Sequence, residues 1–148
     1  MLEEVIASRF DYAEMSQRAL ATHWLPLSAA ERAEFVEIFR SFLSDRYAEK
    51  IEGYSGEQVL YLSERIEGTY AEVRTELRSR KVEIPVDYRL FLKQGRWHAY
   101  DIVTDGVSLV KNYRSQFETI IRAGSYQELV RRLRERTLVE EKRPGRRE

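Results

Sequence analysis

The segment from Pro85 to Val103 constrains the fold most, because it reads as two β-strands joined by a tight turn. Its sequence, PVDYRLFLKQGRWHAYDIV, alternates polar and apolar residues on both sides of Gln94-Gly95, which is typical of a hairpin with one buried face. Asp101 is the lone carboxylate on that face. A two-residue turn predicts four pairs there: Leu92 with Trp97, Leu90 with Ala99, Tyr88 with Asp101, and Val86 with Val103.

Two segments before this hairpin also alternate with a period of two residues. They are EQVLYLSERIEG, residues 57–68, and TYAEVRTELRSR, residues 69–80. In the second segment Val73 and Leu77 share an apolar face, whereas glutamates and arginines share the other face. Together with the hairpin, these segments predict four consecutive antiparallel strands.

The segments on both sides of the strands have the apolar spacing of amphipathic helices. Ser28 and Glu31 have the spacing of a capping box, in which each side chain accepts a hydrogen bond from a free backbone N–H. Ser125 and Glu128 repeat that spacing before the last segment, and Asp105 is a candidate N-cap for the one before it. The predicted helical segments are residues 10–25, 28–51, 106–124 and 126–136.

Helices before and after a run of four strands predict an α+β fold. We expect a curved antiparallel four-stranded sheet, covered on one face by the N- and C-terminal helices. A chain of 148 residues fits one domain, which we place at residues 1–136, with 137–148 as a charged, disordered tail. Many aromatic side chains fall between sheet and helices. They either fill a core or line an apolar pocket, and periodicity does not distinguish the two.

Composition excludes several classes of protein. Lys plus Arg (25) equals Asp plus Glu (25), so no overall charge attracts nucleic acid. The chain has no cysteine and two histidines, which excludes disulfide frameworks, thiol catalysis and structural zinc sites. No apolar run approaches the roughly 20 residues that span a bilayer.

The lone carboxylate of the hairpin allows two interpretations. Asp101 opposite the phenol of Tyr88 would suit a general acid/base pair of a small-molecule isomerase or hydrolase with a cone-shaped α+β fold, because burial raises a carboxyl pKa toward neutrality. Alternatively, Asp101 accepts hydrogen bonds from Tyr88 or from backbone N–H groups and has a structural role. The residues alone leave both open, although a single carboxylate without positioned partners favours the structural role.

Four stretches taken together resemble one known family. They are RFDYAEMSQRALATHW at 9–24, YSGEQV at 54–59, IPVDYRL at 84–90 and GRWHAYDIVTDGVSLVKNYRSQF at 95–117. These stretches resemble the MlaC-type phospholipid-binding proteins, also called the toluene-tolerance family. The similarity runs from about Phe10 to Leu133, which is most of the chain.

The resemblance implies a non-enzymatic carrier in the periplasm. Family members bind phospholipid, use no cofactor, and shuttle lipid between an outer-membrane lipoprotein complex and an inner-membrane ABC transporter, which maintains outer-membrane lipid asymmetry. The resemblance also implies a signal peptide, which this sequence does not show, and a further helix before Arg9, of which MLEEVIAS would be a remnant.

Acyl chains gain about 0.8 kcal/mol per buried CH₂, so a carrier needs a dry apolar interior and no catalytic group. We expect Arg89 and Arg114 to be the candidates that meet the lipid phosphate at the mouth. The predicted lipid-lining residues are Phe39, Leu43, Tyr47, Val73, Val86, Tyr88, Leu90, Ala99, Val103, Val110, Tyr113 and Phe117.

Overall fold

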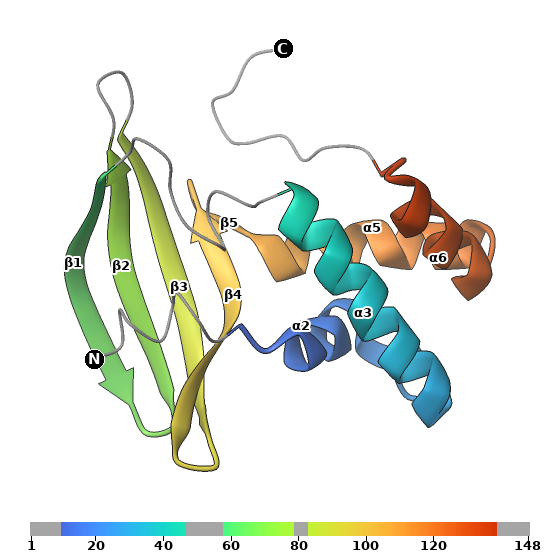
Figure 1. Ribbon diagram of the computed structural model, residues 1–148, viewed down its shortest axis with the longest axis horizontal. Helices are drawn as coiled ribbons and strands as arrows, with labels where there is room; N and C mark the ends of the chain where they lie inside the picture. Colours follow the sequence, from blue (N-terminus) through green and yellow to red (C-terminus); the bar gives the residue numbers. More distant parts are fainter. Residues whose placement is uncertain (1–9, 47–57, 79–82, 139–148) are drawn as a thin grey trace.

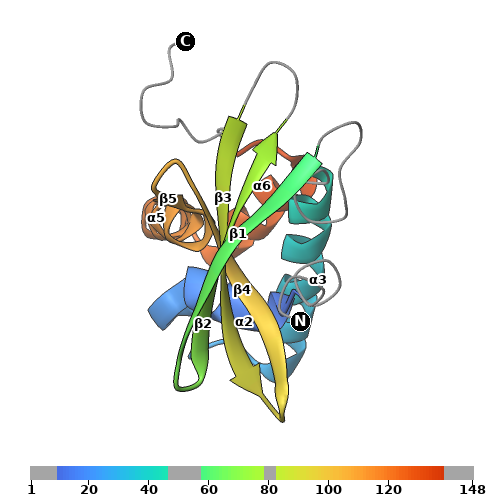
Figure 2. The ribbon, with the colours of Figure 1, turned by 90° about the vertical axis from the view of Figure 1, so that its left-hand side faces the viewer.

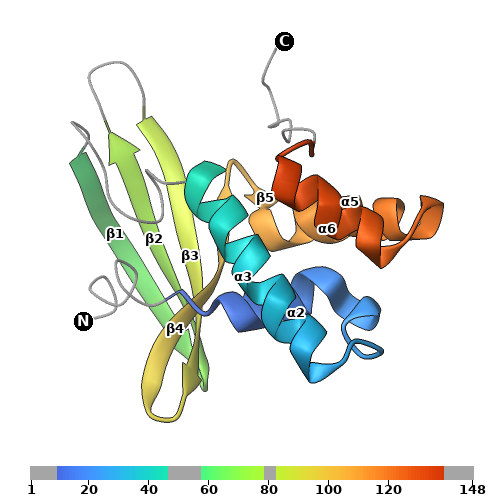
Figure 3. The ribbon, with the colours of Figure 1, turned by 45° about the vertical axis from the view of Figure 1, so that its right-hand side comes forward.

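The computed structural model describes residues 10–46, 58–78 and 83–138, which form two layers. A curved antiparallel sheet makes one layer, and helices from both ends of the described chain make the other (Figure 1). The helices lie together on one side of the sheet (Figure 3). The predicted α+β architecture is therefore confirmed.

The sheet is a meander whose strands pair in chain order, each antiparallel to the next. Seen from the sheet side, its long strands twist across one another (Figure 2). The four predicted strands are present, and a fifth strand of two residues was not predicted. The strands are β1 (Gln58–Glu67), β2 (Tyr70–Arg78), β3 (Glu83–Lys93), β4 (Arg96–Thr104) and β5 (Val107–Ser108).

The β3–β4 hairpin turns at Gln94-Gly95, as predicted. Both turn residues have positive φ angles, 53° and 77°, which is the backbone conformation of a two-residue type I′ turn. The predicted pairs of Leu90 with Ala99 and of Leu92 with Trp97 are confirmed. Beyond Ala99 the register shifts by one residue, because Tyr100 forms a β-bulge and has no partner in β3.

The bulge changes which residues of β4 face the helices. Tyr88 pairs with Ile102 rather than with Asp101, and Val86 pairs with Thr104, so two of the predicted pairs are wrong. Val103 lies on the outer face, where its partner is Asp87 rather than Val86. Ile102 and Val103 are both apolar, so either residue satisfies the alternation and the sequence pattern does not reveal the shift.

The helical layer contains four α-helices and one short 3₁₀ turn among the described residues. The two N-terminal helices enclose the 3₁₀ turn, and the two C-terminal helices follow β5 (Figure 1). The elements are α2 (Tyr12–Leu20), η1 (Ala21–His23), α3 (Ala29–Arg46), α5 (Leu109–Ala123) and α6 (Tyr126–Glu135).

Hydrogen-bonded side chains fix where these helices begin. The Ser28 N–H donates to Glu31 Oε1 (2.9 Å) and the Glu31 N–H donates to Ser28 Oγ (3.1 Å), so the predicted capping box forms. Asp105 does not cap α5, contrary to the prediction. Ser108 is the N-cap, with its Oγ accepting from the Lys111 N–H (3.1 Å), whereas Asp105 occupies the turn before β5 with a φ of 53°.

Ser125→Ala is expected to lower the free energy of unfolding by about 1 kcal/mol. Ser125 Oγ accepts a hydrogen bond from the Glu128 N–H (3.1 Å), and this bond satisfies one of the free N–H groups that open α6. Urea unfolding measures the loss. Ser115→Ala, at an exposed position of α5, is the matched control and is expected to stay within about 0.5 kcal/mol of the wild type. Equal losses in both variants would contradict the capping role.

The two layers are joined along β4 and β5. Helices α2 and α5 pack against β4, and α5 follows β5 without a linker. The Asp11 N–H donates to the Ala99 C=O (2.9 Å), which attaches the start of α2 to the edge of β4. Strands β3 and β2 follow β4 in the sheet, so they lie next to this junction and further from its hydrogen bonds.

The described chain ends on a packed residue, Leu138, which is buried in the core. Its carbonyl accepts a hydrogen bond from Arg46 Nη2 (3.2 Å). Residues 139–148, most of the expected tail, lie outside the described residues, so the division at residue 136 stays a prediction. Among the helices described above, none is both long enough and apolar enough to cross a membrane.

Candidate functional site

The inner face of the sheet is a buried surface made by alternate residues of β2, β3 and β4. In its three central rows the side chains are at most 7% exposed, and apolar groups dominate. Three rows of paired residues cross it: Ala71–Leu90–Ala99, Val73–Tyr88–Ile102 and Thr75–Val86–Thr104.

Helices α3 and α5 contact each other through a mainly aromatic cluster of side chains. The Phe39 ring of α3 lies 5.3 Å from Phe117 and 5.9 Å from Tyr113 of α5, both in edge-on geometry. Phe42 adds a third edge-on contact, 5.6 Å from Tyr113. The Tyr113 hydroxyl accepts a hydrogen bond from Arg46 Nη1 (2.9 Å), so this phenol has a polar partner at the aromatic cluster.

The structure gathers most of the predicted lining residues in one core. Val103 is the exception, because the bulge turns it outward, and Tyr47 lies outside the described residues. Each gathered residue is at most 2% exposed, so in this structure protein side chains fill their surroundings. The gathered residues are Phe39, Leu43, Val73, Val86, Tyr88, Leu90, Ala99, Val110, Tyr113 and Phe117.

The two head-group candidates lie apart from each other. Arg89 is on the outer face of the sheet and has its Nη1 3.8 Å from Asp101 Oδ2. Arg114 is half-buried on α5 and donates its Nε–H to the Arg18 carbonyl on α2 (2.9 Å). Arg114 thus ties two helices together in this structure, and contact of either arginine with a phosphate stays a prediction.

The Asp101 carboxylate accepts three hydrogen bonds from groups of the protein itself. Its Oδ1 accepts hydrogen bonds from the Ile102 N–H (2.8 Å) and the Val110 N–H (3.0 Å), and its Oδ2 accepts one from the Ser108 hydroxyl (2.5 Å). The carboxylate therefore holds β4 against the first turn of α5. Tyr88 faces Ile102, so the acid/base pair imagined for an isomerase does not form.

Sequence reasoning missed two inner-face residues of β4, Ile102 and Thr104. Both are buried, at 3% and 6% exposure, and they occupy the places that the predicted register gave to Asp101 and Val103. The sequence pattern does not reveal this register shift, because a β-bulge at Tyr100 needs no glycine or proline. Thr104 introduces a hydroxyl into a surface that had been predicted to be apolar at that point.

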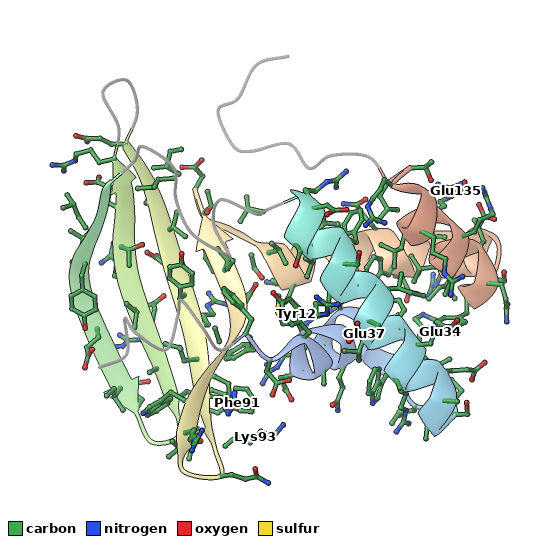
Figure 4. All side chains as sticks on the ribbon, viewed as in Figure 1. Tyr12, Glu34, Glu37, Phe91, Lys93 and Glu135 are labelled. Atoms are coloured by element: carbon green, nitrogen blue, oxygen red, sulfur yellow. The ribbon has the colours of Figure 1, made fainter. Side chains whose placement is uncertain are left out.

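Charged groups lie around this layer rather than within it. Glu34 and Glu37 on α3 and Glu135 on α6 are exposed on the helices (Figure 4). His23 Nε2 lies 2.6 Å from Glu118 Oε1 and links η1 to α5, and this hydrogen bond lowers the pKa of Glu118 below its ordinary value. The described residues contain no group of three or more histidines and carboxylates that could hold a metal ion.

One solved structure is similar to this chain over nearly its whole length. It is the phospholipid-binding protein from Ralstonia solanacearum, determined in complex with a phospholipid. The TM-score is 0.78 and the sequence identity is 26%, and the match covers 91% of this chain and 77% of that chain.

Sequence comparison gives the same relationship. The intermembrane phospholipid transport system binding protein MlaC of Haemophilus influenzae is 25% identical over 101 residues, covering 64% of this chain and 47% of that protein. The chain thus matches about half the length of this relative. The family model for the MlaC protein matches residues 1–135, which is most of the sequence. The predicted relationship is confirmed: this chain belongs to the MlaC protein family.

Proposed function

We propose that this chain is a periplasmic phospholipid carrier that holds acyl chains between the sheet and the helices. The main support for this proposal is the buried layer, in which residues from β2, β3, β4, α3 and α5 form one apolar core. The similar structure from Ralstonia solanacearum was solved with a phospholipid, which supports the same use of this fold here.

The energetics of acyl chains explain why such a layer suits the task. Each CH₂ moved out of water gains about 0.8 kcal/mol, so two long chains gain on the order of 20 kcal/mol. A carrier must offer a comparably dry environment, or the lipid stays in the membrane. Because side chains such as Tyr88 and Phe117 are buried here, lipid entry requires the sheet and helices to separate.

Transfer of lipid between membranes needs no reaction, and the site fits that requirement. The buried carboxylate next to it, Asp101, is committed to three hydrogen bonds within the protein. We therefore propose a binding protein rather than an enzyme, without a cofactor. The Haemophilus relative is named as the binding protein of an intermembrane phospholipid transport system. This name supports the proposal of partners in both membranes. These partners would be an outer-membrane lipoprotein complex and an inner-membrane ABC transporter.

Native mass spectrometry of the protein purified from bacterial cells tests this proposal. We expect a population heavier than the polypeptide by the mass of a phospholipid, and organic extraction should release that lipid. Protein stripped of lipid should recover the same added mass after incubation with labelled phospholipid. An unchanged polypeptide mass in both experiments, with the protein folded by circular dichroism, would contradict a carrier function.

A further inference from the structure

Thr104 has a buried hydroxyl group without a hydrogen-bond partner in the described part of the chain. The residue is 6% exposed and lies on the inner face of β4. Its strand neighbours are Val86 in β3 and Val107 in β5, so apolar side chains flank it on both sides. A buried polar group of this kind is unfavourable unless something else supplies the missing partner.

Thr75 shows that the same row of the sheet can satisfy a hydroxyl within the protein. Thr75 pairs with Val86 from the opposite side, is 3% exposed, and donates its hydroxyl hydrogen to the Val86 carbonyl (2.6 Å). Thr104 flanks the same valine and makes no equivalent bond. The difference shows that burial on this row does not by itself deprive a hydroxyl of a partner.

A threonine hydroxyl needs an acceptor in order to donate its hydrogen. In a diacyl phospholipid the phosphate is charged and stays with water, whereas the ester carbonyls enter the protein together with the acyl chains. A carbonyl oxygen accepts hydrogen bonds and donates none, so it complements an unpaired hydroxyl donor. Thr104 lies at the end of β4, beside the β5–α5 junction, which suits the polar end of an acyl chain.

We propose that the Thr104 hydroxyl donates a hydrogen bond to an acyl ester carbonyl of the bound phospholipid. This inference rests on the carrier function proposed above and adds a polar contact that distinguishes lipids by their linkage chemistry. Lipids whose chains are attached by esters offer the carbonyl acceptor. Ether-linked lipids of the same length and head group lack it.

The test compares dioleoyl phosphatidylglycerol with its dioleyl ether analogue in a competition assay against a fluorescent phospholipid. Delipidated wild-type protein is expected to bind the diester about fivefold more tightly than the diether. Thr104→Val, which replaces the hydroxyl by a methyl group of similar size, should bring this ratio to about one by weakening diester binding alone. Thr104→Ser keeps the hydroxyl and should keep most of the preference.

Ser16→Ala is the matched control. Ser16 on α2 also has a buried hydroxyl without a partner among the described residues, but it lies outside the sheet face. We expect this variant to keep the wild-type ratio of diester to diether affinity. The control therefore separates the effect of this position from the general effect of removing a buried hydroxyl.

An equal diester and diether affinity in the wild-type protein would overturn the inference, whatever the variants do. An unchanged ratio in folded Thr104→Val would also overturn it. The proposed function would fail separately, through the absence of binding of either lipid to the wild-type protein.

Discussion

Ala99→Trp is expected to reduce phospholipid affinity by more than about tenfold. Ala99 is fully buried on the inner face of β4, opposite Leu90, and an indole at this position extends into the layer proposed for acyl chains. Displacing two to four methylenes at about 0.8 kcal/mol each gives a loss of roughly 1.6–3.2 kcal/mol, which corresponds to roughly 15- to 200-fold in affinity. Titration with labelled phospholipid measures it.

The same substitution overpacks the core, so stability must be measured beside affinity. We expect a loss of about 1–3 kcal/mol in the free energy of unfolding, which a folded domain of this size can tolerate. His98→Trp is the matched control, because His98 precedes Ala99 in β4 and is half-exposed on the outer face, 5.9 Å from the Phe91 ring. Wild-type lipid stoichiometry in folded Ala99→Trp would show that the acyl chains lie elsewhere.

The sequence predicts the sheet well where alternation and turn chemistry agree. Gln94-Gly95 defines a two-residue turn, and the apolar alternation of Val73 and Leu77 predicts their burial, which the structure confirms. The register beyond Ala99 fails because a bulge inserts one residue, and an apolar neighbour is available for either face. Local pattern thus predicts which strands pair but not every partner.

Helix starts show the same limit. Asp105 and Ser108 are both good N-cap residues and lie three positions apart, so composition alone cannot choose between them. The choice depends on β5, a two-residue strand that occupies the intervening chain. Ser108 is also the residue that reaches Asp101, and this tertiary contact has no counterpart in the helix pattern.

The candidate site was predictable as a core but not as a pocket. Periodicity identifies Phe39, Tyr113 and Phe117 as inward-facing, and all three are buried and meet between α3 and α5. Apolar spacing predicts that a side chain is buried. It does not predict whether another side chain or a lipid covers that side chain. The carrier hypothesis therefore came from the family resemblance, and Thr104 entered only after the observed register placed it on the inner face.

Asp101→Ala is expected to lower the free energy of unfolding by about 3–5 kcal/mol. The substitution leaves the buried Ile102 and Val110 N–H groups and the Ser108 hydroxyl without their acceptor. Each such group costs about 1–3 kcal/mol when it is buried and unpaired. The Arg89 contact adds little, since it is a 3.8 Å ion pair with a half-exposed partner. Urea unfolding at neutral pH measures the loss.

Asp87→Ala is the matched control for this prediction, because it removes a carboxylate from the neighbouring strand on the outer face. Asp87 has its Oδ2 4.0 Å from Arg74 Nε, and the arginine is largely exposed, so we expect a change within about 0.5 kcal/mol. Similar stability of the Asp87→Ala and Asp101→Ala variants would contradict the bridging role. A large and specific loss at Asp101 would establish this carboxylate as the tie between β4 and the first turn of α5.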